Sequence, residues 1–274
     1  MIIFEERIIL EKILIWNINQ RAGYGKSFYP KLVLDSFDKE LDIIIFTEFY
    51  KHSDWKNTFS NDKYLFETSN NGDNHNEILI AYNREKYSKI GDKYTWKSDY
   101  DKDSPDYLDI CLKDNFGNIF VVVGTRILVN YYDYNNANSL NKEMEARAGQ
   151  GEKIRNRINT IQKKYKIIGG GDFNVGRRNN QNEYWSKSVF EGYLLDKINI
   201  VMPEGVSHQV YKGTEYAGCP DLIFYSNEID VDVYPYNWNF VKDCKDIYVD
   251  GKFTKEIPAP YPDHAQIIAN FNFK

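Results

Sequence analysis

Short apolar segments that run into a polar side chain recur along this sequence, and they constrain its fold more than any other feature. Ile13–Ile18 reads ILIWNI, Asp42–Phe46 reads DIIIF and is followed by Thr47 and Glu48, and Ile167–Asn174 reads IIGGGDFN. Short apolar runs bounded by polar or turn-forming residues predict buried β-strands. A rigid strand that presents a carboxylate or an amide at its tip is a common support for a polar site.

Other segments complete a predicted α/β pattern. Helical spacing of apolar residues predicts helices over Pro30–Leu41 and Glu152–Lys166, and the second helix is also basic. Asn115–Asn118 has the composition of a hairpin turn. Asp54–Asn76 and Tyr94–Asp106 are rich in polar residues and are predicted to be loops. Further strands are predicted over Glu77–Tyr82, Tyr107–Leu112, Ile119–Val123, Asp221–Ser226 and Ala265–Phe271.

Many strands and few helices favour two sheets that pack face to face and are flanked by helices. No Pro/Gly/Ser-rich linker and no internal repeat divides the sequence, so we expect one domain over residues 1–274. The formal charge of −5 argues against a general polyanion-binding surface, because nonspecific binding to nucleic acids depends on clustered Lys and Arg. It leaves room for a local basic groove.

Weaker features of the sequence predict the compartment and the assembly state. Three widely spaced cysteines without a CxxC pattern favour reduced thiols over disulfides or a structural zinc site. The N-terminal segment is interrupted by charged residues and has no signal-peptide pattern. No apolar stretch approaches the roughly 18 to 20 residues that span a bilayer. We therefore expect a cytoplasmic monomer without a membrane anchor.

The polar residues at the predicted strand ends have the chemistry of a phosphate-ester hydrolase. Magnesium prefers oxygen ligands, which Glu48 and Asp263 can provide, and Asp172 can orient or deprotonate a water. His264, fixed in one tautomer by Asp221, can present a protonated imidazole to a phosphoryl oxygen. The amides of two asparagines can bind phosphate or the nucleophile without adding charge: Asn17 and Asn174.

Each of these positions alone has a simpler interpretation. Asp and Asn at strand ends are common turn formers, Gly169–Gly171 can be a bend, and an isolated histidine such as His264 is more often structural. The functional hypothesis therefore depends on the number and the order of the segments rather than on any one residue.

In this order the segments resemble the motifs of the endonuclease/exonuclease/phosphatase superfamily. The resemblance covers nearly the whole chain, and the segments together are far more specific than any one of them. The matching segments are WNIN at Trp16–Asn19, TE at 47–48, GDFN at Gly171–Asn174, PDLIFYS at Pro220–Ser226 and PDHA at Pro262–Ala265.

The resemblance implies a four-layer α/β/β/α sandwich, in which two mixed, mostly antiparallel sheets lie between helices. It implies a divalent cation, Mg²⁺ or Mn²⁺, that binds Glu48 with Asn17 and Asp263 nearby. It also implies roles for the remaining residues. Asp172 positions or activates the water, Asn174 supports it or contacts phosphate, and His264, oriented by Asp221, contacts the scissile phosphate.

Two positions depart from the family pattern. Many members have a Gly-Thr-His run after the central hairpin, where this chain has Gly124, Thr125 and Arg126. Arginine cannot act as a base near neutral pH, but its guanidinium can hold phosphate through a bidentate fork. The alternative for Arg126 is an ion pair with a nearby carboxylate. Some members have Asp where Asn19 stands, so one negative charge is missing near the metal.

The resemblance implies a divalent-metal-dependent phosphodiester hydrolase, and we predict a DNA endonuclease or exonuclease. Asn17, Asn19 and Arg177 are the predicted substrate contacts, with Arg178 beside them, whereas the basic residues of Glu152–Lys166 are predicted to face solvent. One alternative is a phosphatase or phosphodiesterase that acts on a small molecule or lipid headgroup, as inositol phosphatases and sphingomyelinases do. The other is a non-catalytic binding protein, which the retained acidic, amide and histidine residues argue against.

Overall fold

The structure is a computed structural model that describes most of the chain. Almost all of the predicted helix over Pro30–Leu41, together with Arg177 and Arg178, lies outside the described residues. The described residues are 10–19, 40–50, 63–69, 76–96, 104–129, 137–175, 187–192, 197–209, 217–242, 248–249, 252–255, 257 and 261–274.

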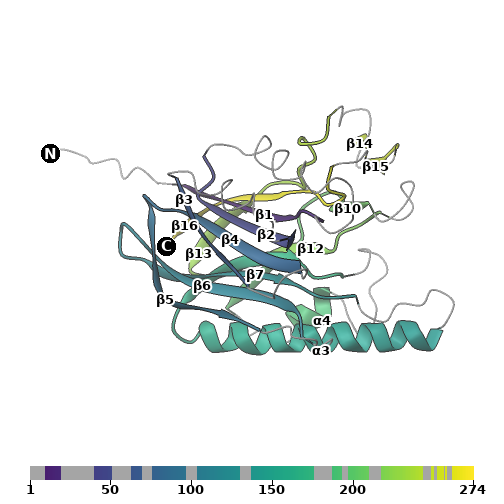
Figure 1. The fold of residues 1–274 in the computed structure, drawn as a ribbon, viewed down its shortest axis with the longest axis horizontal. Helices are drawn as coiled ribbons and strands as arrows, with labels where there is room; N and C mark the ends of the chain where they lie inside the picture. The colour runs from purple at the N-terminus through teal and green to yellow at the C-terminus, as the bar shows by residue number, and fades with distance from the viewer. Residues whose placement is uncertain are drawn as a thin grey trace.

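Two six-stranded sheets form the centre of the molecule (Figure 1). In the first sheet only the two strands at its centre, those beginning at Glu11 and Ile43, run parallel, and all other pairs are antiparallel. Its strands, in spatial order, are β13 (Ile229–Val233), β16 (Ile267–Phe273), β1 (Glu11–Asn17), β2 (Ile43–Tyr50), β4 (Asn76–Asn83) and β3 (Tyr64–Thr68).

The second sheet has the same plan, with one parallel pair at its centre, formed by the strands that begin at Ile119 and Lys166. Its strands, in spatial order, are β5 (Tyr87–Thr95), β6 (Asp106–Asp114), β7 (Ile119–Arg126), β8 (Lys166–Asp172), β12 (Asp221–Ser226) and β9 (Ile198–Val201). Two short pairs lie outside the sheets: β10 (His208–Gln209) with β11 (Ala217–Gly218), and β14 (Tyr248–Val249) with β15 (Lys252–Phe253).

Helix α3 (Ala137–Ile161) runs along the outer face of the second sheet, with the short helix α4 (Lys187–Glu191) beside it (Figure 1). The buried isoleucines Ile154, Ile158 and Ile161 pack in one apolar cluster with residues of β7 and β8. A larger cluster fills the space between the two sheets. The predicted α/β sandwich of two mixed, mostly antiparallel sheets is confirmed. Neither described helix is long and apolar enough to cross a membrane.

Three local predictions need correction. The predicted helix over Glu152–Lys166 begins earlier, at Ala137. It ends at Ile161, because the chain must turn before β8 starts at Lys166. Of the predicted loop over Asp54–Asn76, Tyr64–Thr68 forms the edge strand β3, and of the loop over Tyr94–Asp106, the first two residues complete β5. In both cases pairing with a neighbouring strand overrides a polar local composition.

The basic face of α3 is also less solvated than predicted. The guanidinium of Arg157 makes a bidentate contact with Asp109 on β6, at 2.7 and 3.0 Å. Its carbon Cζ lies 3.7 Å from the ring centroid of Tyr94. This arginine therefore fastens the helix to the sheet and is not available to a ligand.

The three glycines of β8 are strand residues and do not form a bend. A Cβ on Gly169 would lie 2.3 Å from the carbonyl oxygen of Val123, and a Cβ on Gly171 would lie 1.9 Å from that of Thr125. Gly171 also has a φ of +148°, which side chains rarely adopt. Glycine here lets β7 and β8 approach closely, directly before the polar residue Asp172.

We expect Gly171→Ala to lower the free energy of unfolding by roughly 2 to 5 kcal/mol, because it combines backbone strain with overpacking. Gly149→Ala in α3 is the matched control, since a Cβ there meets nothing within 4 Å. Alanine favours a helix by about 1 kcal/mol over glycine, so this variant should be at least as stable as the wild type. Equal urea midpoints for both variants would contradict the packing argument.

Glu11, at the start of β1, is a buried acid in contact with the second sheet. Its carboxylate accepts a hydrogen bond of 2.5 Å from the hydroxyl of Tyr87 on β5. Burial raises the pKa of Glu11 to about 7, and the charges of Asp114 and Asp42 add to this, against the hydrogen bond from Tyr87 and the charge of Lys86. The side chain is therefore protonated in the folded protein at mildly acidic pH.

This raised pKa predicts a loss of stability as the pH rises. Between pH 4.5, the ordinary pKa of a glutamate, and about pH 7 the folded state holds a proton that the unfolded state has lost, so the free energy of unfolding falls across this window. The full loss is roughly 3 kcal/mol. Glu11→Gln should remove this slope when urea unfolding is compared at about pH 5 and about pH 8. Exposed Glu228→Gln should keep the slope, and a Glu11→Gln variant that also kept it would refute the assignment.

Candidate active site

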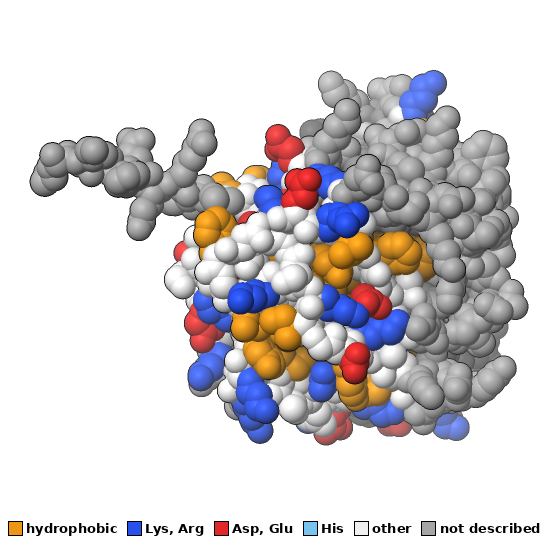
Figure 2. Space-filling view, turned by 60° about the vertical axis from the view of Figure 1, so that its left-hand side comes forward, with side chains coloured by type: hydrophobic (Ala, Val, Ile, Leu, Met, Phe, Trp, Pro, Cys, Tyr) orange, Lys and Arg blue, Asp and Glu red, His pale blue; other side chains and the backbone are white. Residues whose placement is uncertain are grey.

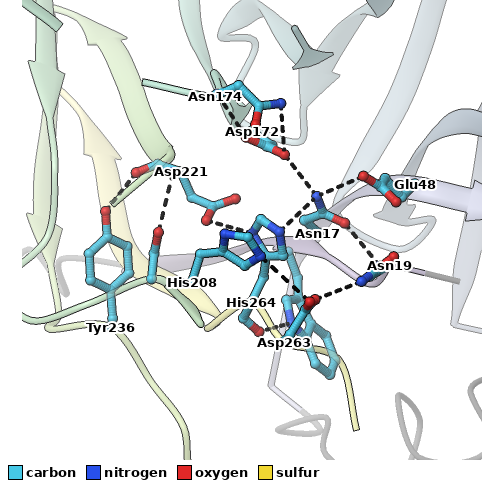
Figure 3. A network of polar contacts seen from close by, with 12 residues as sticks. Asn17, Asn19, Glu48, Asp172, Asn174, His208, Asp221, Tyr236, Asp263 and His264 are labelled. Carbon is cyan, nitrogen blue, oxygen red and sulfur yellow. Dashed lines mark hydrogen bonds and ion pairs between the residues drawn. The ribbon is translucent and has the colours of Figure 1, made fainter. Parts of the chain in front are cut away.

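Strand ends from both sheets meet at one polar site (Figure 3). Asn17 is the last residue of β1, and Glu48 lies in the adjacent parallel strand β2. Asp172 ends β8 and pairs across the sheet with Asp221, the first residue of β12. His264 comes from the segment that leads into β16. The parallel pairs at the sheet centres explain this convergence, because parallel strands end at the same edge.

The imidazole of His264 and the carboxylate of Asp221 form a buried dyad. Nδ1 of His264 lies 2.9 Å from Oδ2 of Asp221, and the two side chains are only 5% and 3% exposed. The indole Nε1 of Trp16 donates to the backbone oxygen of His264 at 2.8 Å, and the hydroxyl of Tyr236 donates to that of Asp221 at 2.6 Å. Both members are thus fixed at the backbone as well as through their side chains.

The imidazole of His264 carries a positive charge at neutral pH, which the carboxylate of Asp221 balances. Burial by itself would lower the pKa of His264, but the carboxylate of Asp221 outweighs burial, and the charges of Asp172 and Asp263 add to it, so that the pKa rises to about 10. Since Nδ1 is used for Asp221, the second ring nitrogen Nε2 faces the site, 3.4 Å from the amide of Asn17. His264 can therefore donate a proton or a strong hydrogen bond there.

Asp172 is held by donors on both carboxylate oxygens. Oδ1 accepts the backbone N–H of Asn174 at 2.8 Å, and Oδ2 accepts the side-chain amide of Asn17 at 3.0 Å. The amide of Asn174 donates to the backbone oxygen of Ile127 at 2.6 Å and lies 3.4 Å from Oδ2 of Asp172. Asn174 therefore supports Asp172 in this structure, and a contact with phosphate stays a prediction.

Backbone strain concentrates at the site. Among the described residues, three that are not glycine have a positive φ: Asn19 at 40°, Glu48 at 51° and Asn174 at 46°. Such conformations persist where the surroundings determine them and are common at functional sites. The pairing of β2 with β4 is irregular between Phe46 and Phe49, and such a bulge changes the direction of the side chains there, including that of Glu48.

Arg126 is an ion-pair partner of two carboxylates. Its Nη2 lies 2.7 Å from Oε1 of Glu48, and its Nη1 lies 3.2 Å from Oδ2 of Asp106. Burial would lower the pKa of Arg126, but the charges of Glu48, Asp106 and Asp172 outweigh it and raise the pKa, so the guanidinium is always charged. The ion-pair alternative for Arg126 is confirmed, and its contact with phosphate stays a prediction.

Asn17 and Asn19 connect the two carboxylates predicted to bind a metal. Asn19 donates through its amide to Oδ1 of Asp263 at 2.7 Å, and its backbone N–H donates to Oδ1 of Asn17 at 2.9 Å. Asn17 directs its amide nitrogen to Oε1 of Glu48 at 3.4 Å. Asn17 thus organises the carboxylates in this structure, and its role as an oxygen ligand stays a prediction.

The donor chemistry fits a hard divalent cation. Glu48 and Asp263 offer carboxylate oxygens, the ligand type that Mg²⁺ and Mn²⁺ prefer. The charge of Arg126 beside Glu48 is offset by Asp106, so these three groups together keep one negative charge. His208, Asp263 and His264 also form a group whose potential ligand atoms lie within 4.8 Å of one another, as do Asp172, Asp221 and His264.

Two residues of the site are absent from the prediction. Asp106 lies opposite Arg126 in the β6–β7 hairpin. A turn at Asn115–Asn118, carried back along the two strands, places Tyr107 opposite Arg126, one residue from the observed partner Asp106. His208 lies in the two-residue strand β10, which has no apolar run beside it, and no sequence signal marked it.

This architecture is the fold of the endonuclease/exonuclease/phosphatase superfamily. Three solved structures with this fold illustrate the similarity, all at low sequence identity. The endonuclease/exonuclease/phosphatase from Bacteroides vulgatus is 17% identical, with a TM-score of 0.63, over 97% of this chain and 100% of that one. D. rerio TDP2 complexed with single-strand DNA product is 13% identical, with a TM-score of 0.63, over 96% and 99%. The human Nocturnin catalytic domain with bound sulfate is 14% identical, with a TM-score of 0.62, over 97% and 95%.

Comparison of the sequence alone gives no match. No family model and none of the curated proteins matches it significantly. The expected fold is therefore confirmed by three-dimensional similarity, whereas the roles of the site residues depend on the geometry described above.

Proposed function

We propose that this protein is a divalent-metal-dependent hydrolase of phosphodiesters and that its substrate is DNA. The observation that carries the proposal is the meeting of Asp172 with the buried Asp221–His264 dyad, whose polar atoms lie within 4.8 Å of one another. A carboxylate that can accept a proton and an imidazolium that can donate one are then available on the two sides of a reacting phosphate.

In the proposed reaction the chain's own residues handle the proton and the charge. Asp172, fixed by Asn17 and Asn174, orients an attacking water and accepts its proton as the water oxygen bonds to phosphorus. His264, protonated through its pairing with Asp221, donates a hydrogen bond from Nε2 to a phosphoryl oxygen as negative charge develops there. The bond from phosphorus to the leaving oxygen breaks, and that oxygen takes its proton from solvent. Contacts within the chain fix both members of the dyad, so little reorganisation is needed in the transition state.

Glu48 and Asp263 are the proposed holders of the cation, with Asn17 and Asn19 aligning them. A bound Mg²⁺ or Mn²⁺ supplies Lewis-acid stabilisation of charge on the phosphate oxygens. Arg126 limits how far the carboxylate of Glu48 can rotate, because it holds one of its oxygens at 2.7 Å.

The substrate class is supported by the relatives with this fold. One of them, D. rerio TDP2, is complexed with a single-strand DNA product, and another, human Nocturnin, holds a sulfate anion. Asn17, Asn19 and Arg177 remain the proposed substrate contacts. Two residues, Val175 and Gly176, separate Arg177 from the GDFN segment.

A small-molecule or lipid-headgroup phosphate is the second candidate. On the face in Figure 2 the described side chains of Lys and Arg are intermingled with those of Asp and Glu, without a broad area of positive charge among them. The net charge is −5, and Arg157 of α3 is engaged by Asp109. Because a long nucleic acid gains affinity from many basic contacts, these observations favour a short or compact substrate.

A panel of substrates tests the proposal. Supercoiled plasmid, abasic duplex, single-stranded DNA, RNA, inositol polyphosphates and sphingomyelin are each incubated with the protein in Mg²⁺ or Mn²⁺. The proposal expects cleavage of at least one DNA substrate that EDTA abolishes. Hydrolysis confined to an inositol phosphate or to sphingomyelin would replace DNA by the second candidate.

A further inference from the structure

A short segment that the sequence did not mark, Ser207–Gln209, lies against the backbone of the catalytic histidine. The backbone N–H of Ala265 donates to the oxygen of Ser207 at 2.7 Å, and the N–H of Gln209 donates to the oxygen of Asp263 at 3.0 Å. His208 and His264 therefore face each other as an isolated antiparallel β-bridge. On the other side, the N–H of Asp221 donates to Oγ of Ser207 at 3.3 Å.

The ring of His208 covers the ring of His264 (Figure 3). The ring centroids are 4.0 Å apart and the planes are inclined by only 21°, which is a stacked arrangement. Nε2 of His208 lies 3.5 Å from Oδ2 of Asp263. Its side chain is 20% exposed, against 5% for His264, so His208 is the outer of the two rings.

The segment is itself held firmly. The side chain of Gln209 accepts the N–H of Ile257 at 2.6 Å and donates to the backbone oxygen of Lys255 at 2.9 Å. β10 also pairs with β11, and Gly218 of that strand precedes Asp221 by three positions in the sequence. A ring mounted on such a segment has little freedom of its own, so it can restrain what it touches.

We propose that His208 is a positioning residue of this active site, which fixes the plane of the His264 ring and the orientation of the Asp263 carboxylate. This rests on the proposed function. The contact with Asp221 fixes one edge of the His264 ring, and the stacked ring of His208 fixes its plane. Asp263 is held from both ends, because Asn19 contacts Oδ1 and His208 faces Oδ2.

Catalytic groups lose much of their effect when they are misplaced by about 1 Å. We therefore expect His208→Ala to lower kcat by about 10- to 100-fold, with KM changed by less than about 3-fold, since His208 positions groups and does not carry substrate binding. The two contacts can be separated. His208→Phe keeps a stacked ring without the contact to Asp263, and His208→Gln keeps a donor near Asp263 without the ring.

The test has a readout that does not depend on turnover. Side-chain NMR of the four histidines follows the His264 ring, and Mn²⁺ titration by calorimetry follows Asp263. We expect His208→Gln to broaden or shift the His264 ring signals with Mn²⁺ affinity close to that of the wild type. His208→Phe should leave the ring signals sharp and weaken Mn²⁺ binding. Thermal unfolding shows whether each variant is folded. If His208→Ala does not fold, His208→Phe and His208→Gln alone test the positioning role of His208.

Unchanged His264 signals together with unchanged Mn²⁺ affinity in both His208→Phe and His208→Gln would overturn the inference, whatever the activity. A loss of kcat/KM that comes entirely from KM would overturn it as well, because it would place His208 in substrate binding. If the wild type hydrolysed no phosphodiester, the proposed function would fail, and the spectroscopic result would still report whether His208 positions its two neighbours.

Discussion

His264→Ala is expected to reduce kcat by about 100- to 10,000-fold, the range for a general acid or base in an enzyme. The variant removes the proton donor that Asp221 maintains at Nε2. It also leaves the carboxylate of Asp221 buried without its partner, which costs roughly 3 kcal/mol or more of stability. Steady-state kinetics on any substrate that the wild type cleaves, with thermal unfolding beside it, measures both effects.

His264→Asn separates the chemistry from the stability. Its amide can donate to Asp221 from about the position of Nδ1, so most of the stability should return, while the donor toward the phosphate is still missing. We expect this variant to be nearly as inactive as His264→Ala. Near-normal turnover in a folded His264→Asn would show that the imidazole is not part of the reaction.

Glu48→Gln is expected to have the largest effect on the metal requirement. The amide lacks the charge that attracts the cation, and Arg126 loses one of its two carboxylate partners, so its positive charge is less compensated. We expect the Mg²⁺ or Mn²⁺ concentration for half-maximal activity to rise by at least about 10-fold and kcat to fall as well. Calorimetric titration with Mn²⁺ gives the affinity independently of turnover.

Glu228→Gln is the matched control for this substitution. It removes the same charge from an exposed carboxylate in the turn between β12 and β13. Its metal requirement should equal that of the wild type. If Glu48→Gln also kept the wild-type metal affinity, Glu48 would have to be reassigned as a structural partner of Arg126.

Much of the sandwich could be predicted because most of its strands are short apolar runs in the sequence. ILIWN, DIIIF and DLIFYS become buried central strands, and the turn at Asn115–Asn118 joins β6 to β7 as expected. The edge strand β3 has no apolar run that predicts it: it is five residues long, Leu65 is exposed and Phe66 is only partly buried. Its pairing with β4 stabilises it, and that partner is not visible in the local sequence.

The site was predictable where a residue follows a strong strand and not elsewhere. Asp172, Asp221 and Glu48 adjoin or lie within buried strands, and the structure brings them into one network. His208 belongs to a short pair fixed by contacts with Asp263 and Ala265, distant in the sequence. The position of His208 in the site is determined by these tertiary contacts, so the periodicity and composition of the local sequence do not predict it.

Hydrolysis of bis(p-nitrophenyl) phosphate, an activated phosphodiester, measures whether this site cleaves phosphodiesters with the help of His264, because the assay does not require the natural substrate. The wild type and His264→Asn are compared in Mg²⁺, in Mn²⁺ and in EDTA. We expect metal-dependent release of nitrophenolate by the wild type, none in EDTA, and a rate at least about 100-fold lower in the variant. Equal rates for the two folded proteins, or release that persists in EDTA, would contradict it.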